Sequence, residues 1–226
     1  MSSAHYFTMK SRGDFPYIAL PVFPSRLFRH GFIFINRNSG ISKPTDLAGK
    51  RIAVQEYRQS AGVWIRGILK SEYGVDFSGV TWLEGGVDTP RRFDETMDLR
   101  PAGDLNLELI GPEKSISDVL ASGEVDAYFG ARAPGAFFES DDVIRLFPDY
   151  RSEERAYFER TRIYPIMHTM IMTEEFHETH PWAAEALFKA LSDSKKWALE
   201  QMRFSGAQRY MLPWLFDDID EMDALF

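Results

Sequence analysis

The chain has no cysteine, an excess of acidic over basic residues, and no long apolar run. Without cysteine it has no disulfide, no thiolate nucleophile and no iron–sulfur or cysteine–zinc site. The 26 Lys and Arg residues against 34 Asp and Glu give a formal net charge of −8. Because nucleic acids and anionic membranes bind basic surfaces, we expect neither as a partner.

No apolar stretch is long enough to cross a bilayer, and the first residues lack the basic and then apolar regions of a signal peptide. We therefore expect a cytoplasmic protein without membrane insertion. What the chain does contain is 226 residues, 44% of them hydrophobic, which is enough to bury a core as one large or two small domains.

A strand-to-helix crossing in residues 46–74 organises the expected fold. Arg51–Val54 is a short apolar run, typical of a strand covered on both faces. From Ser60, the expected N-cap, the spacing becomes helical until Gly74 closes the segment. The inward stripe of this helix is expected to contain Val63, Trp64, Gly67, Ile68 and Tyr73. The start of the helix would then present free N–H groups at the carboxyl end of the strand, where open α/β sheets bind anionic ligands; the alternative is an ordinary core unit with a polar turn.

Polar groups also follow two other expected strands. Glu84 ends the strand at 80–83, with Arg92 further along the same loop, and Arg132 follows the strand at 124–130. Together with the crossing at 46–74, three strand ends then carry polar groups, and a shared ligand cleft explains this better than coincidence does. The alternative is that these charges are simply solvated.

Arginine and histidine meet in the loop at 25–30, which contains Arg29 and His30. A guanidinium group binds carboxylates, and an imidazole moves protons near neutral pH. The alternative is a solvated basic loop. His168 lies inside an apolar strand expected over 164–172, either as a core histidine or as a residue that faces a ligand.

The C-terminal part of the chain is expected to be mostly helical. Residues 141–162 indicate a surface connection with a charged helix. Residues 182–202 indicate a long amphipathic helix packed on a sheet. Its inward side is expected to contain Leu187, Ala190, Leu191, Ser194 and Trp197.

The order of these elements resembles the type II periplasmic-binding-protein architecture. More closely, several segments resemble the 4,5-dihydroxyphthalate decarboxylase family: PVFPSRLFRH, KRIAVQEYRQSAGVWIRGIL, ARAPGAF, RLFPDYR, IYPIMHTM, HPWAAEAL and RYMLPWL. The resemblance runs from about Pro21 to Leu215. It implies an α/β fold with two lobes and a ligand cleft between them, one lobe from 1–30 and 160–226 and the other from 31–159. Members of this family are longer at both ends, so we expect the first lobe to be incomplete.

The resemblance implies a lyase of aromatic catabolism that removes one ring carboxylate from 4,5-dihydroxyphthalate, giving protocatechuate. This chemistry needs a general acid, for which His30 and His168 are candidates, with Glu56 as an alternative proton carrier. Carboxylate binding is expected from Arg29, Arg92 or Arg132. Contacts to the hydroxyls and other polar atoms are expected from Tyr57, Gln59, Ser60, Glu84 and Tyr164, and an apolar wall from Trp64.

A solute-binding protein of an importer, for an aromatic acid, a sulfonate or a thiamine-precursor-like ligand, is the alternative, because one fold serves many functions. A pyrimidine synthase of thiamine biosynthesis is disfavoured, since that group uses a cysteine-rich motif. No nucleotide-binding motif is present, so we expect no organic cofactor. A divalent metal at His30, Glu56 and His168 is left open, as is a homo-oligomer.

Overall fold

A computed structural model describes residues 1–91, 105–203 and 212–226, and the strands in these ranges form two sheets. The strands are β1 (Tyr17–Arg26), β2 (Ile33–Asn36), β3 (Arg51–Val54), β4 (Thr81–Glu84), β5 (Leu107–Leu109), β6 (Ala127–Phe129), β7 (Val143–Arg145) and β8 (Ile166–Thr173). The α-helices are α1 (Ser3–Ser11), α2 (Ser60–Tyr73), α3 (Ile116–Ala121), α4 (Ala136–Glu139), α5 (Tyr150–Thr161), α6 (Glu174–Thr179), α7 (Trp182–Met202) and α8 (Leu215–Leu225). Three 3-10 turns are η1 (His30–Phe32), η2 (Arg37–Ser39) and η3 (Pro44–Leu47).

The larger sheet has the strand order β5-β4-β3-β6-β2-β7. Strands β3, β4, β5 and β6 run parallel, and β2 is antiparallel to both its neighbours. Successive residues of a strand face opposite sides, and both sides are buried: Ile52 and Val54 pack in the core on the α2 face, while Ala53 packs in the core on the α3 face. This double burial explains the short, continuously apolar strand runs and confirms the expected α/β class.

Helix α2 begins at Ser60, with Gln59 rather than Ser60 as its N-cap, and ends at Gly74, whose φ of +67° suits glycine. The side of α2 that packs on the sheet contains Ile65 and Leu69, both buried. The expected inward stripe was therefore partly wrong, because Val63 is 42% exposed. The periodicity fits more than one helical face, and the packing on the sheet selects one of them.

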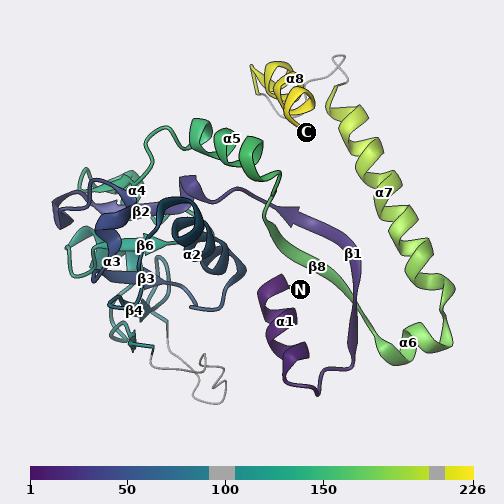
Figure 1. Ribbon diagram of the computed structural model, residues 1–226, viewed down its shortest axis with the longest axis horizontal. Coiled ribbons are helices and arrows are strands. Elements are labelled where there is room, and N and C mark those ends of the chain that lie inside the picture. Colours follow the sequence, from purple (N-terminus) through teal and green to yellow (C-terminus); the bar gives the residue numbers. More distant parts are fainter. Residues whose placement is uncertain (92–104, 204–211) are drawn as a thin grey trace.

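The smaller sheet is the antiparallel ribbon of β1 and β8, which runs away from the larger sheet with α1 beside it (Figure 1). The start of α7 covers the ribbon, where Leu20, Met172 and Ala183 form a small buried cluster. The rest of α7 stands apart from the sheets (Figure 1), and Trp197 is 59% exposed. The expected packing of the whole α7 stripe on a sheet is therefore wrong beyond its first turn.

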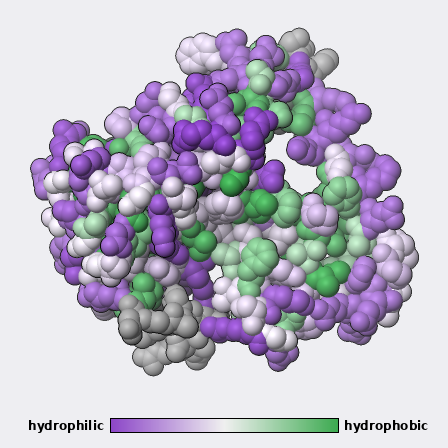
Figure 2. Space-filling view, viewed as in Figure 1, coloured by the Kyte–Doolittle hydropathy of each residue, from purple (hydrophilic) through white to green (hydrophobic). Residues whose placement is uncertain are grey.

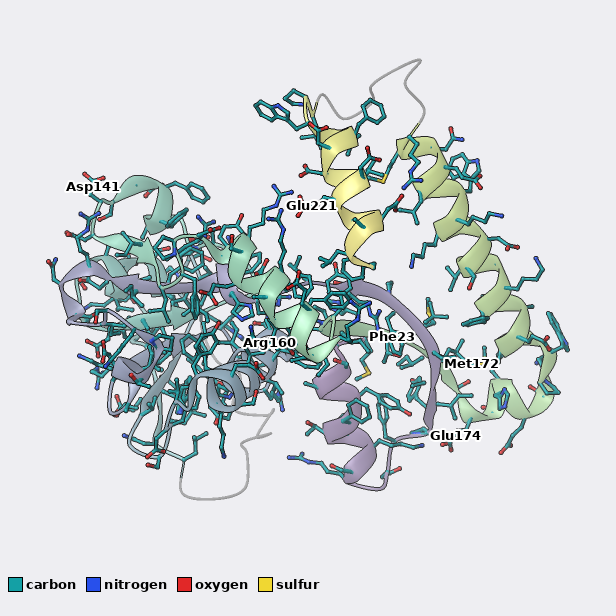
Figure 3. The ribbon with its side chains drawn as sticks, turned by 45° about the horizontal axis from the view of Figure 1, so that its top comes forward. Phe23, Asp141, Arg160, Met172, Glu174 and Glu221 are labelled. Carbon is teal, nitrogen blue, oxygen red and sulfur yellow. The ribbon has the colours of Figure 1, made fainter. Side chains whose placement is uncertain are left out.

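The segment 141–162 is more than a surface connection. Strand β7 pairs with β2 at the edge of the larger sheet, and α5 follows it. Helix α8 lies against α5 (Figure 3), and Arg151 donates to the carboxylate of Glu221 at 2.7 Å. None of the helices in the described ranges has the length and apolarity that crossing a membrane requires.

Candidate active site

A polar pocket of about 180 Å³ lies where the starts of α1 and α2 meet the end of β6 and strand β8. Its lining consists of Ser2, His5, Arg29, Glu56, Arg58, Gln59, Ser60, Ala61, Ala131, Met167 and His168. Ser2 and Gln59 are the N-cap residues of α1 and α2, so two helices begin at the pocket. A helix start carries the positive end of the helix dipole, which favours an anionic guest. At α1 the N–H groups of Ala4 and His5 are already hydrogen-bonded to Ser60 Oγ and Ser2 Oγ.

The pocket brings together Arg29, Glu56, Gln59, Ser60 and His168, which the sequence had singled out from segments far apart in the chain. Among the lining residues that the sequence analysis did not select are two with basic side chains, Arg58 and His5. Arg58 lies in the turn before α2, and this position next to the expected anion site could have identified it as a candidate. His5 lies on α1, a helix that no apolar periodicity indicated.

Arg29 is a buried cation in the pocket wall, only 5% exposed. Its Nε donates to Met167 Sδ at 3.1 Å and its Nη1 to the carbonyl oxygen of Ala131 at 3.2 Å. Burial lowers the pKa of Arg29 to about 10, against the opposing charge of Glu154, so the group stays protonated at neutral pH. Within the described part of the chain no carboxylate forms an ion pair with it. A buried guanidinium without an ion-pair partner favours a carboxylate ligand.

Glu56 and Arg58 form an ion pair on another wall of the pocket. Arg58 Nε donates to Glu56 Oε1 at 2.5 Å, and the two side chains are 16% (Arg58) and 33% (Glu56) exposed. The Glu56 carboxylate thus has a cation beside it at the pocket wall.

The hydroxyl of Ser60 joins α2 to α1. Ser60 Oγ lies 2.7 Å from Ser2 Oγ and 3.2 Å from Ser3 Oγ, and it accepts a hydrogen bond from the N–H of Ala4 at 3.1 Å. Ser60 is 4% exposed. Its lone pairs are therefore largely engaged by α1.

His168 lies on β8 with its side chain exposed at the polar pocket. The neighbouring residues of the strand, Met167 and Thr169, are buried. Alternation along the strand thus directs His168 to the face opposite theirs, where a ligand can reach its imidazole.

His30 is placed elsewhere, although it follows Arg29 directly. The residue is 1% exposed, and its ring centroid lies 5.5 Å from that of Phe147 and 5.4 Å from that of Tyr157. Neither ring nitrogen has a hydrogen-bond partner in the described residues. Burial lowers the pKa of His30 to about 4, so the imidazole is neutral at pH 7. The structure therefore places His30 in the aromatic core and not in the polar pocket.

Tyr57 and Glu84 contact each other rather than the pocket. The N–H of Tyr57 donates to Glu84 Oε1 at 2.5 Å. The ring of Tyr57 packs edge-on against Trp82 and beneath the guanidinium of Arg66, whose carbon lies 3.8 Å from the ring centroid.

Arg132 and Tyr164 also lie outside the polar pocket. Arg132 is 60% exposed and pairs with Asp88 at 2.5 Å. Burial alone would raise the pKa of Asp88, but hydrogen bonds from Ser117, Gly135 and Arg132 lower it overall. The hydroxyl of Tyr164 donates to the carbonyl oxygen of Arg26 at 3.1 Å.

Trp64 lines a second, apolar pocket on the other side of Ser60, whose lining includes Phe7, Leu20, Phe23, Val63 and Trp64. Arg92 lies outside the described residues. Across the ranges 1–91, 105–203 and 212–226, no group of three or more His, Cys, Asp or Glu residues is arranged to hold a metal ion.

Comparison with known proteins gives a consistent family. No protein-family model matches the chain. A 4,5-dihydroxyphthalate decarboxylase from Comamonas testosteroni is 38% identical over 220 residues, which cover 97% of this chain and 66% of that protein. A 4,5-dihydroxyphthalate decarboxylase from Pseudomonas putida is 43% identical over 156 residues, covering 69% of this chain and 59% of that protein. The chain thus spans less than two thirds of the length of either relative.

Among solved structures, the periplasmic aliphatic sulphonate binding protein from Escherichia coli is similar with a TM-score of 0.48 and 12% sequence identity. The match covers 98% of this chain and 64% of that one.

Proposed function

The chain is a homologue of the 4,5-dihydroxyphthalate decarboxylase family, and from that premise we propose that it removes one ring carboxylate from 4,5-dihydroxyphthalate, giving protocatechuate and carbon dioxide. The observation that carries the proposal is the buried guanidinium of Arg29 in the wall of the polar pocket, without an ion-pair partner in the described residues. A dianionic substrate would supply the missing carboxylate. The two helix starts at the pocket would stabilise its remaining negative charge.

In the proposed reaction, Arg29 holds the carboxylate that stays on the ring, and His168 acts as the general acid. His168 gives a proton to the ring carbon that bears the leaving carboxylate. The para hydroxyl supplies electron density to the ring during this step. The bond from that carbon to the carboxylate then breaks, its electron pair restores the aromatic ring, and carbon dioxide leaves.

Glu56 is the alternative proton carrier, since it shares the pocket with His168. Gln59 is proposed to bind a substrate hydroxyl. Ser60, Tyr57, Glu84, Arg132, Tyr164 and His30 have partners or positions that support roles in packing rather than in substrate contact.

Incubating the purified protein with 4,5-dihydroxyphthalate, while following carbon dioxide and protocatechuate, tests the proposal. His168→Asn should lower kcat about 100-fold or more, because general acid catalysis contributes that much. The matched control is His180→Asn, since His180 is an exposed histidine outside the pocket. Full activity in His168→Asn with loss in Glu56→Gln would transfer the acid role to Glu56.

Arg29→Met should weaken substrate binding about 10- to 100-fold, because a charge-assisted contact to a carboxylate is lost. Arg26→Met is the control, being an exposed arginine on β1 outside the pocket. Tight binding of 4,5-dihydroxyphthalate without turnover would contradict the decarboxylase and favour the solute-binding alternative.

We also propose the division into lobes at 1–30 with 160–226 and at 31–159. It is supported by the sheets, because β1 and β8 fall in the first lobe and β2 to β7 in the second. The cytoplasmic location, the lack of an organic cofactor and the choice between monomer and homo-oligomer stay predictions.

A further inference from the structure

The apolar pocket, of about 480 Å³, is larger than the polar pocket. It lies between α1, α2 and the β1–β8 ribbon, and hydrophobic residues gather on this part of the surface (Figure 2). Phe23, on strand β1, is one of the residues that line this pocket (Figure 3). A volume of this size falls in the range of pockets that bind small organic molecules.

Four aromatic side chains line the apolar pocket. Tyr6 and Phe7 contribute from α1, Phe23 from β1 and Trp64 from α2. No charged side chain of the described residues lines it. A charged ligand would lose its hydration there without gaining a partner, whereas a neutral aromatic ring gains apolar burial and ring contacts.

Ser60 lines both pockets, and its hydrogen bonds to Ser2, Ser3 and Ala4 build the wall between them. On the polar side of this wall lies the Arg29 guanidinium. On the apolar side, the indole N–H of Trp64 is already satisfied by the carbonyl oxygen of Ile166 at 2.9 Å. The two neighbouring pockets therefore select opposite ligand chemistries.

We propose that the apolar pocket is a second binding site, for an uncharged aromatic compound, separate from the carboxylate site at Arg29. The probe is 2-naphthol, which is uncharged at pH 7, with 2-naphthoate as the charged compound of the same ring system. In a fluorescence titration, 2-naphthol should bind at this site.

The first variant, Val63→Trp, fills the pocket from an exposed position on α2. It should weaken 2-naphthol binding at least tenfold. Ala19→Phe fills the pocket from β1 and should weaken binding to the same degree. Because it lies on another element, it shows whether the effect of Val63→Trp is due to a local change in α2. Lys70→Trp, exposed on α2 and outside the pocket, should change the affinity less than threefold.

Arg29→Met distinguishes the two sites, because it should leave 2-naphthol binding within threefold while weakening 2-naphthoate. The proposal is overturned if 2-naphthol does not bind up to its solubility limit, or if neither filling variant weakens it more than Lys70→Trp does. It is equally overturned if Arg29→Met abolishes 2-naphthol binding, since the compound would then occupy the polar pocket. None of these outcomes depends on decarboxylation, so they are read separately from turnover.

Discussion

Burying the imidazole of His30 among Tyr73, Phe147 and Tyr157 keeps it neutral in the folded protein. Its pKa falls from an ordinary value of 6.5 to about 4, mainly by burial. The carboxylates of Glu153 and Glu72 oppose this shift, and Arg160 adds to it. Between those two pH values the unfolded chain binds a proton at His30 that the folded chain does not. Acid therefore favours unfolding through this residue.

Replacing His30 by Phe should remove that pH dependence. Stability conferred by the neutral imidazole is fully present above pH 6.5 and is lost as the pH falls towards 4, by about 3 kcal/mol in total. Urea unfolding of the parent and of His30→Phe between pH 7 and 4.5 measures the difference. Glu154, whose pKa is raised by burial, contributes the opposite slope in both proteins and cancels in the comparison. Equal slopes in parent and variant would contradict the prediction, and His180→Phe is the exposed control.

Arg29 and His30 also show how much the sequence predicts about the placement of single residues. An arginine and a histidine in one loop marked both residues as candidates for the site. In the structure, Arg29 lines the polar pocket, whereas His30 packs in the aromatic core. That choice depends on α5, which packs against η1 and lies more than a hundred residues further along the chain. No local pattern contains this information.

At the scale of elements, the end of β6 supports the pocket. Gly130 follows β6, and a Cβ at this position would lie 2.5 Å from ring atoms of Tyr128, which is fully buried. The next residue, Ala131, holds Arg29 through its carbonyl oxygen. The glycine therefore lets the chain pass over the Tyr128 ring and reach the guanidinium.

Gly130→Ala should cost about 1–3 kcal/mol, because the buried ring cannot move away without strain. Gly67→Ala is the matched control: it lies in α2 with open space around it and should stabilise by up to about 1 kcal/mol through helix propensity. Urea unfolding at pH 7 measures both changes. Two substitutions with the same sign would contradict the close approach at Gly130.

Sequence periodicity predicted where helices and strands begin and end better than it predicted which side of a helix is buried. The bounds of β3, α2 and α7 agree with the expected ones, since apolar runs and the glycine after α2 are local signals. The inward side of α2 was predicted only in part, since Ile68 is buried but Val63 is exposed. The packing of α7 was wrong beyond its first turn, because it depends on what the helix packs against. Helix α1 gave no signal at all, since its only buried residue is Tyr6.

For the whole molecule, the polar pocket joins residues that are distant in sequence, such as Ser2, Ser60 and His168. A resemblance of segments could predict that these regions matter, but only the fold shows which side chains meet. The antiparallel ribbon of β1 and β8 carries few buried residues. Most of the stability should therefore come from the cores on the two faces of the larger sheet.

A pair of leucine substitutions tests how the ribbon and α7 contribute. Leu20 is 5% exposed in the cluster on β1, so Leu20→Ala should cost about 2–5 kcal/mol by leaving a cavity. Leu187, on α7, is 40% exposed, so Leu187→Ala should change the free energy of unfolding by no more than about 0.5 kcal/mol. Urea unfolding of the two variants under the same conditions gives the comparison. If Leu187→Ala were as costly as Leu20→Ala, the apolar stripe of α7 would be covered in solution, and its exposure in the described fold would be contradicted.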